Sequence, residues 1–250
     1  MDEKTFYNQI YKAGLKGALP QWHSLIRLGQ NKIPYRQCLR YLKPPGQVLD
    51  WGAGDGHFSF FLIQIGLDTI GYTFDELPDF LTREKSFQKV DGKPNGPVKI
   101  PFPDRKFDAV VSFGVLEHVH ETGGEQSLSM REIHRILKED GLFLCFHLPN
   151  RISWIEGMVK LANLFLPQKL HAHSKKFSRR DMEALVSPLN FKIIEYGRYN
   201  FLPRGRLNIL PQFIADFHPL VWIFNAVDEI CTFLFNPFCQ NWFFIIKKVQ

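Results

Sequence analysis

The residues best suited to chemistry lie in a glycine-rich segment at positions 48–56, which reads Val-Leu-Asp-Trp-Gly-Ala-Gly-Asp-Gly. Asp50 sits in an apolar run, and Gly52, Gly54 and Gly56 follow it. Glycine lets a backbone turn tightly or approach a ligand closely, because it carries no Cβ. A helix that begins after the last glycine would offer positive partial charge from its free amides. The pattern favours a ligand-binding loop over a purely structural turn.

Three histidines, His118, His147 and His173, fall where strand ends or loops are expected. An imidazole titrates near neutral pH, so it is able to accept a proton from a reacting hydroxyl. Each of them could equally be a packed or hydrogen-bonded structural residue. We take His147, at the exit of a strand, as the first candidate for a general base and His118 as the second.

Alternating strands and helices must position these residues. Hydrophobic periodicity predicts strands at Gln47–Trp51, Thr69–Thr73, Val98–Ile100, Phe107–Phe113, Leu142–His147, Phe191–Tyr196 and Trp242–Lys247. It predicts helices at Phe6–Lys16, Trp22–Leu42, His57–Gly66, Glu76–Lys85, Gln126–Leu137, Trp154–Leu166 and Arg179–Val186, with breaks at Pro20 and Pro34.

This order predicts an α/β fold: a Rossmann-like, seven-stranded, mostly parallel sheet with helices on both faces. Within a single domain we expect an N-terminal helical cap (1–45), a cofactor-binding core (46–200), an apolar insertion or lid (201–240) and a last strand (241–250). Ligands of such sheets bind at the carboxyl ends of the strands. The site residues should therefore gather there.

The segment around Asp50 resembles the first motif of class I S-adenosylmethionine-dependent methyltransferases, in which an acid stands two residues before G-x-G-x-G. Asp50, Gly52, Gly54 and Gly56 match that motif position by position. The resemblance implies that this loop binds the methionine part of S-adenosyl-L-methionine. The resemblance extends over Gln47–Tyr196. The chain is similar to the branch that contains ubiquinone-biosynthesis O-methyltransferases at three segments, Ile100–Asp104, Phe107–Ser112 and Val115–Val119.

Two positions depart from the family's pattern. The acid that binds the ribose hydroxyls in the family has Thr73 in its place, with Asp75 two residues later. Either the Thr73 hydroxyl or the carboxylate of Asp75 or Glu76 fills this role. The family's acid near the adenine is also missing, which implies weaker affinity or contacts from backbone groups. At the end of the fourth strand, we expect Phe113 and Gly114 to contact the cofactor.

The sequence at the end of the fourth strand limits the classes of methyl acceptor that we expect. Residues 112–115 read Ser-Phe-Gly-Val, not the Asp/Asn-Pro-Pro-Tyr tetrad with which related enzymes hold amino groups. We therefore expect no nucleic acid, and predict methylation at an oxygen of a small or lipid-like acceptor. Ubiquinone-type enzymes bind a metal through Glu-x-x-Glu-His, but Gly114 replaces the first glutamate before Glu117 and His118. No metal site is predicted. The alternatives are a nicotinamide-dependent oxidoreductase and a non-catalytic binding module.

Composition and charge narrow the class of protein. The chain has 250 residues and a formal charge of +6, with its basic residues scattered rather than in runs. Nine of its 24 phenylalanines lie at or after position 201, five of them within Leu207–Phe235, which favours an apolar substrate and a peripheral membrane contact. The uncharged stretch Cys231–Ile246 is shorter than the ~20 residues that a membrane span needs. Unpaired cysteine spacing and the lack of a signal segment lead us to expect a cytoplasmic protein that is able to associate with a membrane.

Overall fold

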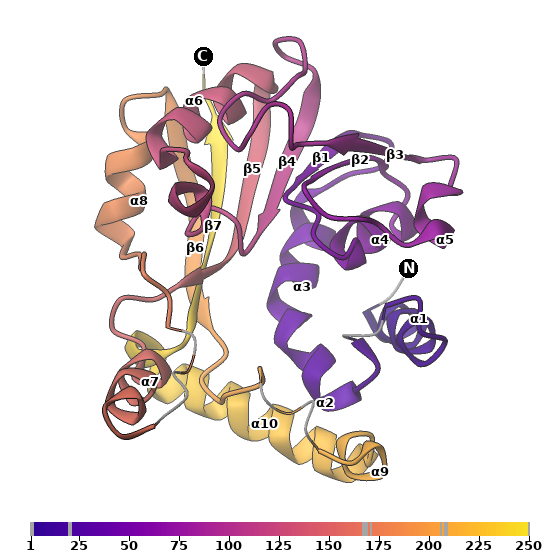
Figure 1. Ribbon diagram of the computed structural model, residues 1–250, viewed down its shortest axis with the longest axis vertical. Helices are drawn as coiled ribbons and strands as arrows, with labels where there is room; N and C mark the ends of the chain where they lie inside the picture. Colours follow the sequence, from indigo (N-terminus) through magenta and orange to yellow (C-terminus); the bar gives the residue numbers. More distant parts are fainter. Residues whose placement is uncertain are drawn as a thin grey trace.

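The computed structural model describes residues 3–19, 22–166, 170, 172–205, 207 and 210–249. Its centre is a seven-stranded sheet in the order β3-β2-β1-β4-β5-β7-β6 (Figure 1). The strands are β1 (Gln47–Trp51), β2 (Asp68–Thr73), β3 (Phe87–Asp91), β4 (Phe107–Phe113), β5 (Leu137–Pro149), β6 (Phe191–Tyr199) and β7 (Asn241–Lys248). All pairs are parallel except those of β7, which runs antiparallel to β5 and β6. The predicted seven-stranded, mostly parallel sheet is confirmed.

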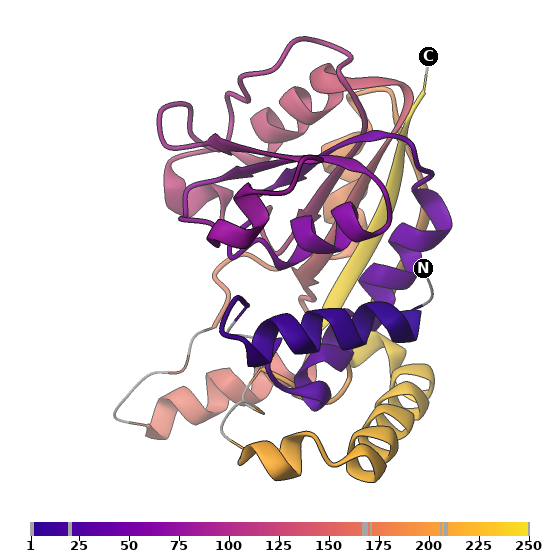
Figure 2. The same ribbon diagram turned by 90° about the vertical axis from the view of Figure 1, so that its right-hand side faces the viewer.

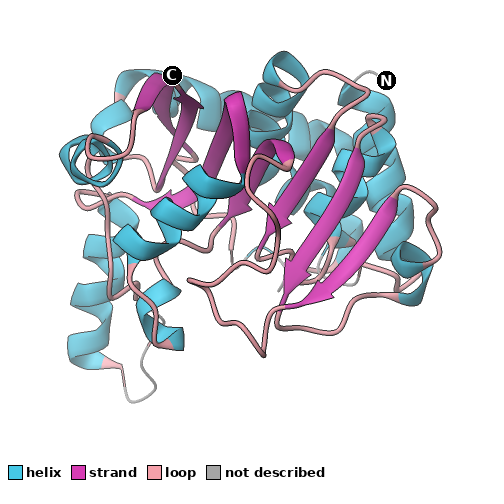
Figure 3. Ribbon diagram, turned by 90° about the horizontal axis from the view of Figure 1, so that it is seen from above, coloured by secondary structure: helices cyan, strands magenta, loops and turns pink. Residues whose placement is uncertain are grey.

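Helices cover both faces of this sheet (Figure 3). They are α1 (Glu3–Leu15), α2 (Leu25–Leu28), α3 (Lys32–Tyr41), α4 (His57–Gln64), α5 (Asp79–Thr82), α6 (Gln126–Ile136), α7 (Trp154–Phe165), α8 (Arg179–Val186), α9 (Gln212–Ala215) and α10 (His218–Leu234), with 3₁₀ turns at Gly29–Asn31, Val119–Thr122 and Asn236–Phe238. The apolar runs of the central strands reflect this double coverage, because both faces of each strand are buried.

Two hydrophobic cores result, one on each face. Met130 of α6 and Met182 of α8 pack into the first core with Leu49 of β1. Tyr35 of α3 packs into the second core with Val48. Neighbouring residues of β1 thus serve opposite cores, because successive side chains of a strand point to opposite faces.

The strand order reverses between β1 and β4. From β1 the chain builds outward through β2 and β3, and then returns to place β4 on the other side of β1. Connections that leave adjacent parallel strands in opposite directions open a crevice at the carboxyl ends of those strands. The loops that follow β1, β2 and β4 meet at this crevice.

Three helices lie at one end of the molecule. Figures 1 and 2 show α7, α9 and α10 at the end toward which β5 runs before it leads into α7. Helix α2 packs against both α9 and α10. The aromatic segment late in the chain therefore lies next to the N-terminal helices.

One strand prediction is wrong. Residues 93–98 form turns rather than the start of a strand, and the third strand of the sheet is β3, which pairs with β2. Ile100 is buried, but its backbone N–H donates to the Glu132 carboxylate (3.2 Å) instead of to a neighbouring strand. The apolar pattern at 98–100 reflects the burial of a loop side chain.

Two helix predictions also need correction. The segment predicted as Glu76–Lys85 contains only the short α5. The predicted break at Pro34 is wrong, because Pro34 lies in the first turn of α3. A proline is tolerated there, since the N–H that it lacks would have no partner within the helix. Pro20 lies outside the described residues.

Candidate functional site

The glycine loop joins β1 to α4, and three of its residues have a left-handed backbone conformation. Gly52, Gly54 and Gly56 have φ values of +80°, +53° and +81°. A Cβ on Gly52 would lie 2.3 Å from Val115, and one on Gly56 would lie 2.5 Å from Leu81. A Cβ on Gly54 would meet nothing closer than 3.9 Å. Gly52 and Gly56 are thus required by packing, whereas Gly54 borders open space.

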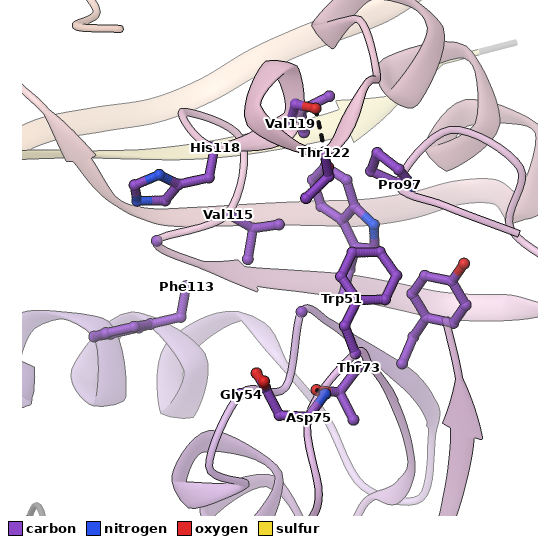
Figure 4. Close-up of a pocket in the computed structure, with 14 residues that line it drawn as sticks. Trp51, Gly54, Thr73, Asp75, Pro97, Phe113, Val115, His118, Val119 and Thr122 are labelled. Atoms are coloured by element: carbon purple, nitrogen blue, oxygen red, sulfur yellow. Dashed lines mark hydrogen bonds between the residues drawn. The ribbon is translucent and has the colours of Figure 1, made fainter. Parts of the chain in front are cut away.

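That space includes a cavity of about 300 Å³ at the carboxyl ends of β1, β2 and β4 (Figure 4). It brings together six of the residues singled out from the sequence: Gly52, Gly54, Thr73, Asp75, Phe113 and Gly114. The candidate base His118 lies at its rim. Aromatic and apolar groups complete the wall, namely Trp51, Tyr72, Phe74, Pro97, Val115 and Val119. Such a lining suits a flat, largely apolar ring with a few polar anchors.

The two candidates for the ribose role differ in their environment. Thr73 is buried, and its hydroxyl accepts a hydrogen bond from the backbone N–H of Asp75 (3.0 Å). Asp75 is exposed at the cavity wall, and no described group bonds its carboxylate. The Thr73 hydroxyl therefore shapes the turn that presents Asp75, and the Asp75 carboxylate is available to a ligand.

A second cavity, of about 420 Å³, adjoins the first. Gly52, Gly54, Asp75 and Phe113 line both cavities. The second cavity is also lined by residues of the N-terminal segment, of the glycine loop and its flanks, and by the candidate base: Trp22, Arg27, Gln30, Asp50, Asp55, His57 and His147. None of the described residues of 201–240 lines either cavity.

Asp55 organises one wall of this second cavity. Its carboxylate accepts hydrogen bonds from Trp22 Nε1 (3.0 Å) and from the backbone of His57 (3.2 Å), and it lies 3.0 Å from His57 Nδ1. Burial acts to raise the pKa of Asp55, but these hydrogen bonds outweigh it and hold the pKa below its ordinary value. The Trp22 and His57 rings are in contact, with 4.2 Å between ring centroids and 32° between ring planes. Asp55 thus fixes two rings beside the glycine loop.

Arg27 of α2 supplies a cation to the same cavity. Its guanidinium carbon lies 5.4 Å from the centre of the Trp22 ring. Its Nε is buried and finds no hydrogen-bond partner within the described part of the chain. Burial lowers the pKa of Arg27, and the Asp55 charge opposes that change. A partly buried cation of this kind is stabilised by an anionic ligand group.

Asp50 is fully buried behind the loop. It accepts a hydrogen bond from Ser59 Oγ (2.6 Å), while its other oxygen has no partner among the described residues. Burial raises the pKa of Asp50 to about 6, and the Ser59 hydrogen bond limits the rise. Asp50 therefore supports the turn from within.

His147 adopts a left-handed backbone conformation (φ +64°) at a bulge of β5. Its ring stacks on Phe113 with 4.4 Å between ring centroids. Its backbone N–H donates to Tyr199 Oη, which also lies 2.9 Å from His147 Nδ1. Burial lowers the pKa of His147 to about 3, so the imidazole is neutral at physiological pH.

A second group of side chains surrounds Glu117. This residue is buried, and burial raises its pKa to about 8. Glu117, His118 and His173 each offer a ligand atom within 4.8 Å of the others. The two imidazoles are held by carboxylates, since His118 Nδ1 lies 2.9 Å from Glu121 and His173 Nδ1 lies 2.7 Å from Glu156. These donors fit a divalent cation. The 114–118 segment alone did not indicate this arrangement, because His173 comes from a distant loop.

The sequence predictions missed Trp22, Arg27, His57 and Tyr199. Trp22 and Arg27 lie in the segment expected to form only a cap, and Tyr199 lies at the end of the strand β6. Of these four residues, His57 could have been found from the local sequence, because it directly follows the third glycine of the loop. The other three reach the site through tertiary packing.

Comparison with known proteins places this geometry in context. A family model described as a methyltransferase domain matches residues 27–196. A probable S-adenosylmethionine-dependent methyltransferase of Mycolicibacterium smegmatis is 27% identical over 146 residues, which are 58% of this chain and 52% of that protein. A ubiquinone/menaquinone biosynthesis C-methyltransferase of Bartonella tribocorum is 23% identical over 164 residues, which are 59% and 60% of the two chains. The chain spans about half the length of the first curated relatives that it matches.

Solved structures agree on the fold. The 1,6-didemethyltoxoflavin-N1-methyltransferase of Burkholderia thailandensis, with its substrate and S-adenosylhomocysteine bound, has a TM-score of 0.56 at 14% identity. The match covers 98% of this chain and 87% of that one. Support for the ubiquinone branch comes only from the distant Bartonella relative, whose name specifies transfer to carbon rather than oxygen.

Proposed function

Since the chain belongs to the methyltransferase-domain family and its cofactor is S-adenosyl-L-methionine, we propose that it transfers the cofactor's methyl group to an oxygen of a small or lipid-like acceptor. The observation that carries this proposal is the junction of the two cavities at Gly52, Gly54, Asp75 and Phe113. In the proposed arrangement the residues of the first cavity would hold the adenosine, and the second cavity would hold the methionine end beside the glycine loop and also admit the acceptor.

The cofactor's polar groups have matching partners. The exposed Asp75 carboxylate is our proposed acceptor for the ribose hydroxyls. The methionine end carries a carboxylate, and Arg27 is the cation that lines the second cavity beside the glycine loop. A charge-assisted hydrogen bond of this kind is about twice as strong as a neutral one. We therefore assign the cofactor carboxylate to Arg27.

Methyl transfer needs alignment more than acid–base machinery. When bound, S-adenosyl-L-methionine would supply an electrophilic methyl group to the acceptor oxygen and would leave as S-adenosylhomocysteine with the electron pair of the broken carbon–sulfur bond. The stacked pair of Phe113 with His147 and the contacting pair of Trp22 with His57 are proposed to exclude water from this path. A hydroxyl acceptor also loses a proton, which His147 is proposed to accept. In the tautomer that places the imidazole proton on Nδ1, that proton is donated to Tyr199 Oη and Nε2 keeps its lone pair.

Calorimetry with S-adenosylhomocysteine and with NADH tests the cofactor assignment. We expect S-adenosylhomocysteine to bind and NADH not to bind. Binding of NADH alone would favour the oxidoreductase alternative, and binding of neither would favour the non-catalytic module. The acceptor class can then be sought by incubating labelled cofactor with lipid, quinone, sugar and RNA extracts.

A pair of arginine variants tests the carboxylate assignment. Arg27→Ala should lower affinity for S-adenosylhomocysteine by about tenfold or more, because a hydrogen bond to a charged group contributes roughly 1.5–3 kcal/mol. Arg83→Ala is the matched control, since Arg83 is exposed directly after α5 and its described charged contact is Asp79. Equal affinities of the two variants would remove Arg27 from the cofactor site.

A further inference from the structure

Helices α7, α9 and α10 form one end of the molecule (Figure 2). This end exposes large apolar side chains. On α7 these are Met158, Leu161, Leu164 and Phe165. On α9, α10 and their connections they are Phe213, Phe217, Trp222, Ile223, Val227, Ile230, Phe233, Leu234, Phe235 and Phe238. We refer to these residues as the apolar end.

Helix α10 is amphipathic, but it exposes its apolar face to solvent and turns its polar face toward the protein. Its exposed large residues recur at helical spacing, through Trp222, Ile223, Val227, Ile230 and Phe233, so they share one face. Its polar face points inward instead. Asp228 is buried and forms an ion pair with Arg204 (2.9 Å), and Asn225 lines a cavity beside it.

This inward polar face fixes the orientation of α10. The Asp228 carboxylate also accepts the backbone N–H of Leu202 (2.7 Å), and Arg204 donates to the carbonyl of Ile26 in α2 (2.8 Å). Breaking a buried ion pair leaves an uncompensated charge, which costs several kcal/mol. The helix therefore cannot roll to bury its apolar face without separating these groups.

The exposed apolar area is large. Phe165, Phe213, Trp222 and Phe233 have exposed fractions of 80%, 77%, 72% and 84%. Because an aromatic side chain covers roughly 150–250 Å², these four alone present on the order of 500–800 Å². The largest apolar patch of a typical monomer is about 300–600 Å². This amount of exposed apolar area favours an apolar neighbour at this end.

The charges around the apolar end favour an anionic lipid surface as that neighbour. The acids on these helices are held by partners within the chain. Asp216 accepts hydrogen bonds from Tyr11 (2.7 Å) and from the backbone of Leu25 (2.9 Å), and Glu229 pairs with Lys32. Glu156 of α7 pairs with Lys176 (3.0 Å). In contrast, Lys160 is exposed at the edge of the apolar face of α7, with no carboxylate of the described chain in ion-pair range.

From this arrangement we infer that the apolar end docks on the surface of a phospholipid bilayer. No helix of the described chain is both long and apolar enough to cross a membrane, so α7, α9 and α10 lie in the interface, with their aromatic rings at the level of the headgroups. Helix α2, which carries Arg27, packs directly behind α9 and α10. Docking would therefore bring the acceptor cavity close to the lipid. That link to catalysis rests on the proposed function, whereas the docking itself does not.

Vesicle flotation tests the docking. The wild type should float with phosphatidylcholine vesicles that contain phosphatidylglycerol, and less with pure phosphatidylcholine. The Trp222→Glu/Phe233→Glu double variant should lose binding by about tenfold or more, because two apolar contacts are replaced by charges at the interface. Leu128→Glu is the matched control, since Leu128 is an exposed apolar residue on α6 near the other end of the molecule. A wild type that never floats would overturn the inference.

Two further measurements distinguish docking on lipid from dimer formation through the same surface. Tryptophan emission should shift to shorter wavelength on vesicles in the wild type, and the shift should shrink in Trp222→Phe, which still floats. If sedimentation shows a dimer that the double variant converts to monomer without vesicle binding, the apolar end joins two copies and the inference is wrong. The double variant should keep its S-adenosylhomocysteine affinity, so a failure to dock is distinguishable from failure of the cofactor assignment.

Discussion

The hydroxyl of Thr73 accepts a hydrogen bond from the backbone N–H of Asp75 at 3.0 Å. Thr73, which stands where the family places its ribose-binding acid, therefore uses its hydroxyl oxygen for a hydrogen bond within its own turn. The same bond holds the next carboxylate at the wall of the first cavity. This relationship separates the two candidates: Thr73 shapes the turn, and we propose that Asp75 faces the ligand.

Asp75→Ala should weaken S-adenosylhomocysteine binding by ~1–3 kcal/mol, because hydrogen bonds from the ribose to a charged group are lost. Glu76→Ala serves as the control, since the Glu76 carboxylate pairs with Lys89 instead (3.1 Å). Calorimetry on both variants checks the assignment. An Asp75→Ala protein with unchanged affinity would transfer the ribose role to Thr73 or Glu76.

Gly54→Val should abolish cofactor binding, because its side chain would project into the space shared by the two cavities. The left-handed conformation also costs about 1–2 kcal/mol for a residue with a Cβ. Gly96→Val carries the same backbone strain at φ +68°, with no atom within 4 Å of the added Cβ and outside the residues that line either cavity. Comparing melting temperature and affinity for the two variants isolates the effect of the cavity. Near-normal binding by Gly54→Val would contradict the loop assignment.

The parts of the fold that the sequence predicts well are those set by local spacing. The glycine positions, the strand β1 and the reversal into α4 depend on neighbouring residues, so Asp50 and Gly52 could be placed without tertiary information. Trp22 and Arg27 could not, because they reach the second cavity through packing of the N-terminal helices against the sheet. The sequence predicted only an apolar segment at Leu207–Phe235 and not the helix α10. Which side it turns to solvent is decided by the distant ion pair of Asp228 with Arg204.

Glu117→Gln should change how stability depends on pH. The folded pKa of Glu117 is raised to about 8 from an ordinary value of 4.5. Between about pH 4.5 and 8 the unfolded chain releases this proton while the folded chain keeps it, so the wild type loses stability as pH rises. The variant lacks that loss, and its stability relative to wild type should increase across this window by at most ~1.4 kcal/mol per pH unit.

Denaturant unfolding at several pH values in the presence of a chelator measures this difference, with Glu84→Gln as an exposed control. Parallel pH profiles of the wild type and Glu117→Gln would contradict the buried, proton-holding state of Glu117. If a divalent cation added without chelator stabilises the wild type but not the variant, Glu117, His118 and His173 form a metal site that the sequence did not predict.

His147→Ala should lower turnover by ~100-fold or more and leave cofactor affinity nearly intact, because the acceptor hydroxyl loses its positioned proton acceptor. His118→Ala is the comparison, since His118 lies at the rim of the first cavity but not in the second. Single-turnover rates and calorimetry on each variant give the two readouts. Unchanged turnover in His147→Ala would reassign the base to His118 or His173, or would indicate an acceptor that ionises without help.

The pH dependence of the wild-type rate provides an independent check on His147. Its pKa is lowered to about 3 by burial, so the proton-accepting form persists at every pH above that value. Turnover should therefore show no loss attributable to this imidazole between about pH 8 and 5. A decline centred near the ordinary histidine pKa of about 6.5 would instead indicate a solvated base. Tyr199→Phe tests the same point, because it removes the hydroxyl that contacts both the Nδ1 and the backbone N–H of His147. It should lower the rate while preserving S-adenosylhomocysteine affinity.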